Sequence, residues 1–226
     1  MAITSDTLKA IPYFSNLDTE IFEKLKRVLF EKKVGRGEMI LFEGEPARSL
    51  FFVASGAVKI FKTSAEGKEQ ILSIVRPGES FNDISIFDDG PNPAGAQAMG
   101  PVELYGIGKE EMDDILRQHP QMALMVIKTM ARRVRQLVSL VEDLSFRRVL
   151  SRVARILLEY GSDKTEPKTR LTQQDIAAMA GTAREVVGRS LKNLEENGTI
   201  RMESHRVIIT NHEALKQLAL QVGVTN

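Results

Sequence analysis

Residues Leu171 to Arg189 read LTQQDIAAMAGTAREVVGR, a pattern typical of two short helices joined by a tight turn. Thr172 and Asp175 stand three residues apart, so each can cap the backbone beside the other at the start of the first helix. Gly181 then supplies the bend that small units of this kind use. The segment therefore predicts a helix–turn–helix.

The second helix of this pair has one apolar and one polar face. Inward positions on both helices are small or apolar, with Ile176, Ala177 and Ala180 on the first helix and Val187, Leu191 and Leu194 on the second. The opposite face of the second helix carries Arg184, Glu185, Gly188, Arg189 and Lys192. Because arginine can donate two hydrogen bonds to guanine and glutamate can accept one from cytosine, this face suits base edges in the major groove. A solvated helix with a surface Arg–Glu pair is the alternative interpretation.

A hairpin pattern after the second helix distinguishes these interpretations. Asn197-Gly198 closes the helix, and Ile200–Met202 and Val207–Thr210 predict two strands around a tip at Glu203–His205. A capped helix, a glycine turn, a polar-faced helix and a hairpin, in that order, are specific to winged helix-turn-helix domains. We therefore predict binding to double-stranded DNA. The predicted DNA-contacting residues are Thr172, Gln174, Thr182, Arg184, Glu185, Gly188, Arg189 and Lys192.

Composition narrows the class of protein. The 226 residues include no cysteine, which excludes disulfides, cysteine-ligated zinc or iron–sulfur sites and thiol switches. We see neither a membrane-spanning apolar run nor a signal-peptide pattern, so we expect a cytoplasmic protein without a membrane partner. Lys and Arg number 18 against 21 Asp and Glu in residues 1–145, and 13 against 9 in residues 146–226. The basic excess thus coincides with the predicted DNA-binding part, although a weak excess alone also fits a solvated surface.

Residues 35–108 have the texture of a small β domain. Short runs at Ser49–Val53, Val58–Thr63, Gln70–Val75 and Val102–Ile107 favour strands. Glycine recurs every 10–12 residues, the length of one strand and one turn, at Gly44, Gly56, Gly67, Gly78, Gly90 and Gly100. This rhythm predicts an antiparallel roll or barrel rather than a parallel sheet. A short helix is expected before it, capped by Asp18 and ending near Leu29.

A long helix is predicted to begin at Pro120, after a shorter helix that ends near His119. Its apolar residues are spaced alternately by three and four: Ile127, Met130, Val134, Leu137, Val141 and Leu144. Such a seam favours a parallel homodimer, and a helix packed on the roll of its own chain is the alternative. Another helix is expected over Phe146–Tyr160.

The predicted fold class is therefore α+β, with an antiparallel β-roll, a long dimerisation helix and a C-terminal winged helix-turn-helix. The predicted domains are an effector-sensing β-roll domain at 1–119, a dimerisation helix and hinge at 120–145, and a winged helix-turn-helix domain at 146–226.

The whole arrangement resembles the family of the catabolite activator and fumarate–nitrate regulators. The likeness covers nearly the entire chain, and its most specific match is Gly181 to Arg189, where Arg-Glu-x-x-Gly-Arg is similar to the catabolite-activator branch. The resemblance implies a homodimeric transcription regulator that contacts RNA polymerase. It also implies that Arg184, Glu185 and Arg189 read a TGTGA-like half-site repeated as an inverted pair.

The sensor domain departs from the family's cyclic-nucleotide binders, whose phosphate cassette ends in an Arg-Ser pair. Pro93 and Ala94 stand there instead and offer neither charge nor hydroxyl. Leu137 and Val138 replace the Thr-Ser pair that contacts adenine, although Asp83 can still accept a ribose hydroxyl. We therefore expect a small-molecule effector other than cyclic AMP, or none. The candidate pocket residues are Asn82, Asp83, Ile84, Ser85, Pro93, Ala94, Met130, Val134, Leu137 and Val138.

The identity of any cofactor stays open, with apolar or haem-bearing ligands, a cyclic dinucleotide or no ligand as alternatives. His119, His205 and His212 are the only histidines, and we interpret His119 as a turn residue rather than a haem ligand. The methionines at helical spacing could line a pocket but are more typical of a core.

Two other functions are alternatives to DNA-binding regulation. No nucleophile–base set, metal cluster or phosphate loop is visible, so we predict neither an enzyme nor a metal site. A cyclic-nucleotide module that controls a protein partner is the second alternative, which the hairpin and the Arg-Glu-x-x-Gly-Arg face disfavour.

Overall fold

The computed structural model describes residues 11–14, 19–160, 171–203 and 206–221. The chain divides into two compact units, Met1–Lys62 with Ser73–Arg135 and Thr63–Leu72 with Gln136–Asn226. The first elements in chain order are η1 (Pro12–Phe14), α2 (Thr19–Val28), β1 (Phe30–Val34), β2 (Met39–Leu41), β3 (Ser49–Ser55), β4 (Val58–Thr63), β5 (Glu69–Val75), β6 (Ser80–Phe81), α3 (Asp83–Phe87), β7 (Gly95–Ala98) and β8 (Val102–Gly108). They are followed by α4 (Lys109–Gln118), α5 (Gln121–Phe146), α6 (Val149–Tyr160), α7 (Gln173–Ala180), α8 (Arg184–Glu196), β9 (Ile200–Glu203), β10 (Arg206–Ile209) and α9 (His212–Leu220).

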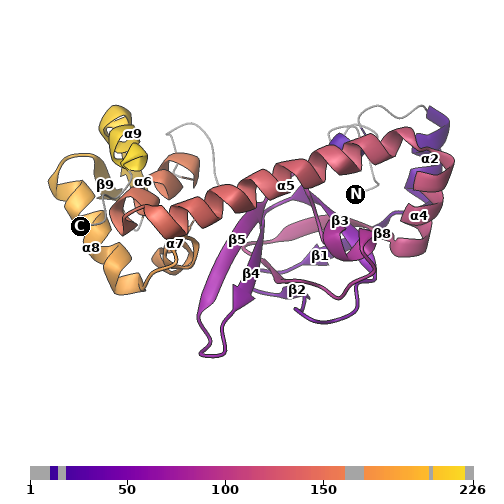
Figure 1. The fold of residues 1–226 in the computed structure, drawn as a ribbon, viewed down its shortest axis with the longest axis horizontal. Helices are drawn as coiled ribbons and strands as arrows, with labels where there is room; N and C mark the ends of the chain where they lie inside the picture. Colours follow the sequence, from indigo (N-terminus) through magenta and orange to yellow (C-terminus); the bar gives the residue numbers. More distant parts are fainter. Residues whose placement is uncertain (1–10, 15–18, 161–170, 204–205, 222–226) are drawn as a thin grey trace. The chain divides into compact units, whose positions relative to one another are not determined.

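Two four-stranded sheets form the β-roll, in the orders β1-β8-β3-β6 and β2-β7-β4-β5 (Figure 1). The pairs β1/β8, β3/β8, β3/β6, β2/β7 and β4/β7 are all antiparallel. Apolar side chains from both sheets form one core, to which Val53, Val58 and Leu104 belong. The predicted antiparallel roll is thus confirmed, and the four predicted strands lie where they were expected, to within two residues at their ends.

The recurring glycines mark turns in four of the six cases. Gly44, Gly56, Gly67 and Gly78 have φ angles of 81°, 83°, 81° and 86°, a left-handed conformation that residues with a Cβ rarely adopt. At Gly56 a Cβ would also lie 2.4 Å from the carbonyl oxygen of Pro101. Gly90 and Gly100 do not have a positive φ. The regular glycine spacing therefore reflects a left-handed backbone conformation at the first four turns.

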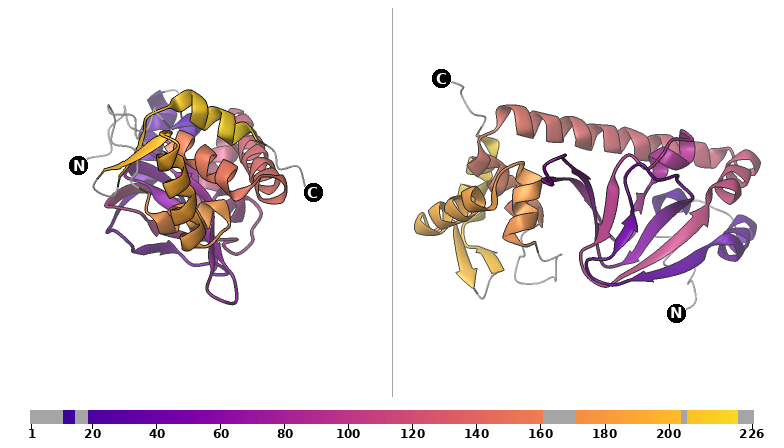
Figure 2. Two further views of the ribbon diagram at one scale, coloured as in Figure 1. Left: turned by 90° about the vertical axis from the view of Figure 1, so that its left-hand side faces the viewer. Right: turned by 90° about the horizontal axis from the view of Figure 1, so that it is seen from below.

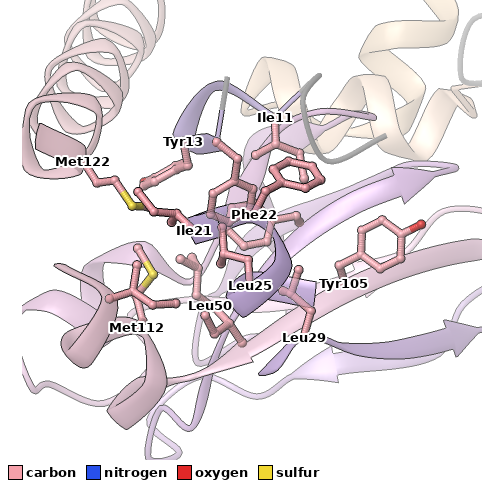
Figure 3. Close-up of a cluster of buried hydrophobic side chains, with 14 of the residues drawn as sticks. Ile11, Tyr13, Ile21, Phe22, Leu25, Leu29, Leu50, Tyr105, Met112 and Met122 are labelled. Atoms are coloured by element: carbon pink, nitrogen blue, oxygen red, sulfur yellow. The ribbon is translucent and has the colours of Figure 1, made fainter. Parts of the chain in front are cut away.

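Helices cover one sheet of the roll and complete a second core. Phe14 and Phe52 lie with ring centroids 4.8 Å apart, and residues of α2 pack beside them. Met112 of α4 and Met122 of α5 are buried in the same cluster (Figure 3). These two methionines are core residues, as their helical spacing indicated. The predicted cap of α2, Asp18, lies outside the described residues.

The long helix α5 runs for 26 residues and begins at Gln121, one residue after the predicted start at Pro120. Met122 and Val126 pack against the core of the roll, and Met130 of the seam is half-buried. The exposed fractions are 61% for Ile127, 59% for Val134 and 62% for Val141. Within the compact unit that contains the roll, the roll therefore leaves Ile127 and Val134 uncovered.

A third core holds α6 to α9 and the β9–β10 hairpin together. Leu157, Ile176, Val187, Leu194 and Leu215 are all buried in it. Figure 2 shows the short hairpin extending beside α8. The helix predicted to begin at Phe146 begins instead at Val149, because α5 continues through Phe146 before the chain turns. Helix α9 was not predicted from the sequence, although its Leu215 closes this core.

Candidate nucleic-acid interface and sensor site

A complete capping box fixes the start of α7. The Thr172 hydroxyl accepts a hydrogen bond from the Asp175 backbone N–H at 3.1 Å. In return the Thr172 backbone N–H donates to the Asp175 carboxylate at 2.8 Å. The predicted cap is therefore confirmed, and it satisfies two backbone donors that a helix start would otherwise leave unpaired.

Gly181 makes the turn between α7 and α8. Its φ of 61° is left-handed, and its N–H donates to the carbonyl of Ala177. Ile176 and Ala180 on α7 and Val187 on α8 are buried between the helices, as are Leu191 and Leu194. All the predicted inward positions are thus confirmed. With this side occupied, the polar side of α8 is directed outward.

The outward side chains of α8 are not engaged with the rest of the described chain. Arg184, Glu185 and Arg189 are exposed, and no ion pair or side-chain hydrogen bond joins them to another described residue. Lys192 is also exposed, with its Nζ 3.7 Å from Oε1 of Glu196. The Arg–Glu surface pair that the alternative interpretation required does not form among these residues. Two guanidinium groups and one carboxylate are thus free to meet another molecule.

Other predicted contact residues flank this face. Thr172 and Gln174 are exposed at the start of α7, and Thr182 is half-buried at the turn. Gly188 is half-buried within α8, where a glycine costs about 0.5–1 kcal/mol relative to alanine. A Cβ at Gly188 would meet only Oε1 of Gln173, at 3.9 Å, which is an ordinary contact. The packing of the described chain therefore does not require glycine there.

The hairpin β9–β10 pairs antiparallel from Ile200↔Ile209 to Glu203↔Arg206. Glu195 of α8 anchors it, because its carboxylate accepts a 2.8 Å hydrogen bond from the Met202 N–H. The predicted wing is thus present, and the tip residues 204–205 lie outside the described chain. The hairpin also carries exposed Arg201, which pairs with Glu203. Sequence reasoning missed the role of Glu195, which has no local signal.

A buried polar cluster surrounds the predicted sensor residue Asp83. Its Oδ1 accepts hydrogen bonds from the Tyr13 hydroxyl and, at 2.8 Å, from the Ser80 hydroxyl. Its Oδ2 lies 2.5 Å from a guanidinium nitrogen of Arg133, which belongs to α5. Burial, and then the Asp83 charge, raise the pKa of the Tyr13 phenol, so this hydroxyl stays protonated and donates. The acceptor predicted for a ligand hydroxyl is thus used by the chain itself.

The remaining pocket candidates in the roll do not form one polar surface. Asn82 has a left-handed φ of 68° and donates its amide to the Ser49 carbonyl at 3.0 Å. Ser85 is buried and donates to the Pro91 carbonyl at 3.2 Å, and Ala94 is buried. Ile84 is 41% exposed. The polar candidates are therefore held by internal bonds.

On α5, the candidates Val134, Leu137 and Val138 are exposed, and Met130 is half-buried.

A lysine that sequence reasoning missed lies at the position of the absent Arg-Ser pair. Lys62 Nζ donates to the Pro93 carbonyl at 3.1 Å and is paired with Glu43 at 2.5 Å. Because Glu43 already neutralises this ammonium group, it supplies little net positive charge for a phosphate. Its identification needs the pairing of β4 with β7, which brings it beside the cassette.

The described residues contain no group of three His, Asp or Glu side chains arranged to hold a metal ion. The backbone N–H of His119 donates to the Ile115 carbonyl at 2.8 Å and closes α4, consistent with the interpretation as a turn residue. Nor is any described helix both long and apolar enough to cross a bilayer.

Comparison with known proteins gives matches to both units. Residues 31–119 match the cyclic nucleotide-binding domain, and residues 151–218 match the Crp-like helix-turn-helix domain. The chain is 31% identical over 212 residues to the cyclic AMP receptor protein of Thermus thermophilus, across 94% of this chain and 98% of that protein. It is 30% identical over 213 residues to a CRP-like cAMP-activated global transcriptional regulator of Mycobacterium tuberculosis, across 91% and 95%.

A solved structure extends the comparison to the fold. FixK2 from Bradyrhizobium japonicum has a TM-score of 0.77 at 23% identity, and the match covers 87% of this chain and all of that one.

Proposed function

Because the chain belongs to the CRP/FNR family of transcription regulators and carries its helix-turn-helix DNA-binding domain, we propose that it binds an inverted-repeat operator as a homodimer. The outward face of α8 is the observation that carries this proposal. Arg184, Glu185 and Arg189 project from one side of a helix whose other side is buried. Bidentate arginine donors suit guanine and a carboxylate suits cytosine, which fits a TGTGA-like half-site.

The exposed seam of α5 supports the homodimer. Five of the six seam residues, Ile127, Val134, Leu137, Val141 and Leu144, are exposed large hydrophobic side chains in the single chain. Contiguous apolar surface of this kind marks an interaction site, and the same seam on a second copy is self-complementary at a heptad spacing. Arg132 and Arg135 flank it with charges, as in a two-stranded coiled coil. A two-fold dimer would present two α8 helices to two half-sites.

We further propose that cyclic AMP is not the effector, although the two relatives above bear names that refer to it. Pro93 and Ala94 lack the charge and hydroxyl that hold a cyclic phosphate, and Lys62 beside them is paired with Glu43. Asp83 is already bonded to Tyr13, Ser80 and Arg133. The exposed valine and leucine side chains of α5 suit an apolar ligand better than cyclic AMP. A regulator that binds no ligand is the alternative.

We propose that the protein acts in the cytoplasm, where chromosomal DNA and RNA polymerase are found. We also propose that it contacts the polymerase. The family is one of transcription regulators rather than enzymes.

Selection from random duplexes tests the proposal. Purified full-length chain, without added nucleotide, should enrich sequences that contain two inverted half-sites at one preferred spacing. Enrichment of an unpaired half-site would refute the homodimer, and absence of any enriched sequence would refute specific DNA recognition by this chain.

A further inference from the structure

The junction between α5 and α6 is held by an arginine cluster around one carboxylate. Asp143 lies in the last turn of α5, and its Oδ1 accepts from Arg147 Nε at 2.8 Å and from Arg155 at 2.7 Å. Arg155 also donates to the Ser139 hydroxyl at 2.8 Å, one turn earlier on α5. All of these residues belong to one compact unit. A single carboxylate thus joins the end of the long helix to the first helix of the DNA-binding domain.

The same cluster reaches a third helix. Arg147 donates to the Ala219 carbonyl in the last turn of α9 at 2.7 Å, where a cation is also favoured by the helix dipole. Arg152 of α6 donates to the carbonyl of Arg147 at 2.7 Å. The side chains of Arg147 and Arg152 therefore connect α5, α6 and α9 around residues 147 and 148, which lie between α5 and α6. The Arg147 and Asp143 side chains are only 12% and 17% exposed.

We propose that Asp143 fixes the angle between the dimerisation helix and the DNA-reading domain, and thereby determines which spacing between half-sites the dimer accepts. This inference rests on the proposed function, because it needs a dimer that reads two half-sites. Asp143 would be a positioning residue for recognition, since it lies in the joint and not on the outward face of α8. The hydrogen bonds of Asp143 side-chain and carbonyl oxygens to other described residues involve Arg147, Arg152 and Arg155, none of which lies on α8.

The geometry of DNA explains why a stiff joint gives spacing selectivity. One inserted base pair moves a half-site by about 3.4 Å along the axis and turns it by roughly 35°. Two DNA-binding domains on rigid joints can contact both half-sites after such a shift only if the joints or the DNA deform. Hydrogen bonds between a carboxylate and guanidinium groups are short and strong, so the Asp143 cluster resists the deformation. Without the carboxylate, Arg147 and Arg155 would repel each other, and the chain could bend at Arg147–Arg148.

Glu142 provides a matched control at the neighbouring position. Its side chain is 52% exposed and lies 3.6 Å from Arg147, with no second arginine in an ion pair with it among the described residues. An exposed and long ion pair contributes little to stiffness. Removing Glu142 deletes the same charge from the same turn of α5 but leaves the cluster around Asp143 in place.

The experiment measures full-length protein binding to four duplexes by fluorescence anisotropy. They are the paired operator at the spacing preferred by the unaltered chain, the same operator with one base pair inserted or deleted at its centre, and a single half-site. For the unaltered chain we expect a change of one base pair to weaken binding at least about tenfold, the factor of one charge-assisted hydrogen bond. In Asp143→Ala the ratio should fall to about threefold or less, whereas the single half-site should bind as before.

Three outcomes decide the inference. Glu142→Ala should keep the spacing ratio of the unaltered chain, and an equal loss of selectivity in Glu142→Ala and Asp143→Ala would overturn the role of Asp143. An unchanged ratio in Asp143→Ala would also overturn it. If Asp143→Ala loses half-site binding, the spacing ratio is measured in Asp143→Asn instead, because asparagine retains one acceptor oxygen. Loss of half-site binding in Asp143→Asn as well would overturn the inference. It would show that Asp143 maintains the fold of the DNA-binding domain. Failure of the unaltered chain to bind any paired operator would refute the proposed function instead.

Discussion

Replacing Gly188 by alanine should stabilise the DNA-binding domain and weaken DNA binding at the same time. Gly188 lies inside α8, where alanine is favoured over glycine by about 0.8–1 kcal/mol because it loses less backbone entropy. The new Cβ meets only Gln173 Oε1, at 3.9 Å, so no clash offsets this gain. We expect the melting temperature of the domain to rise by about 3–8 °C, measured by circular dichroism.

The expected effect on DNA binding has the opposite sign. Gly188 lies between Arg184 and Arg189 on the outward face, so the proposed complex places the bare backbone of α8 against the DNA. A methyl group inserted into a close-packed contact costs about 1–3 kcal/mol, which raises the dissociation constant of one half-site by about 5- to 150-fold. Anisotropy titration of the selected operator measures this change in affinity.

Asn193→Ala serves as the control, because Asn193 is exposed, lies about 140° around α8 from Gly188, and its substitution also favours the helix. It should leave operator affinity unchanged to within about twofold. The reasoning would be refuted if Gly188→Ala bound the operator as tightly as the unaltered chain, since α8 would then not approach DNA over Gly188. A lowered melting temperature of Gly188→Ala would show instead that the glycine serves the fold.

Three further predictions concern the dimer, the bases and the effector. Leu137→Asp together with Val141→Asp should give monomers in light scattering with much weaker operator binding, because two charges would interrupt the apolar seam, and a retained dimer would contradict the seam. Arg184→Ala or Arg189→Ala should each cost about 1–3 kcal/mol per half-site and relax specificity at one guanine, whereas Lys192→Ala should weaken all sequences alike and flatten the salt dependence. Equal losses for the Arg variants on operator and random duplexes would mean that they contact only the backbone. Calorimetry should show no saturable cyclic AMP binding at micromolar concentration, since loss of two charge-assisted contacts weakens binding by about 100- to 10,000-fold, and micromolar binding coupled to tighter operator binding would refute this.

The helix-turn-helix could be predicted from the sequence because its signals are local. Capping needs only Thr172 and Asp175 three residues apart, and the turn needs only the conformational freedom of Gly181. The spacing of apolar residues along α8 assigns its inward and outward faces without knowledge of the rest of the fold. For the same reason the seam of α5 could be predicted from its alternating spacing, and Ile127 and Val134, which share a compact unit with the roll, are exposed in the structure.

The contacts in the sensor site and at the α5–α6 junction arise only from the tertiary structure. Tyr13 and Asp83 are 70 residues apart, and Arg133 is a further 50 residues along the chain, so no sequence pattern signals that they meet. Lys62 reaches Pro93 only because β4 pairs with β7. At the break after Phe146, Arg147 likewise binds the carbonyl of Ala219, which is 72 residues further along the chain. Local backbone preferences and periodicity can be read from one segment, whereas the partners of a buried charge come from segments that only folding brings together.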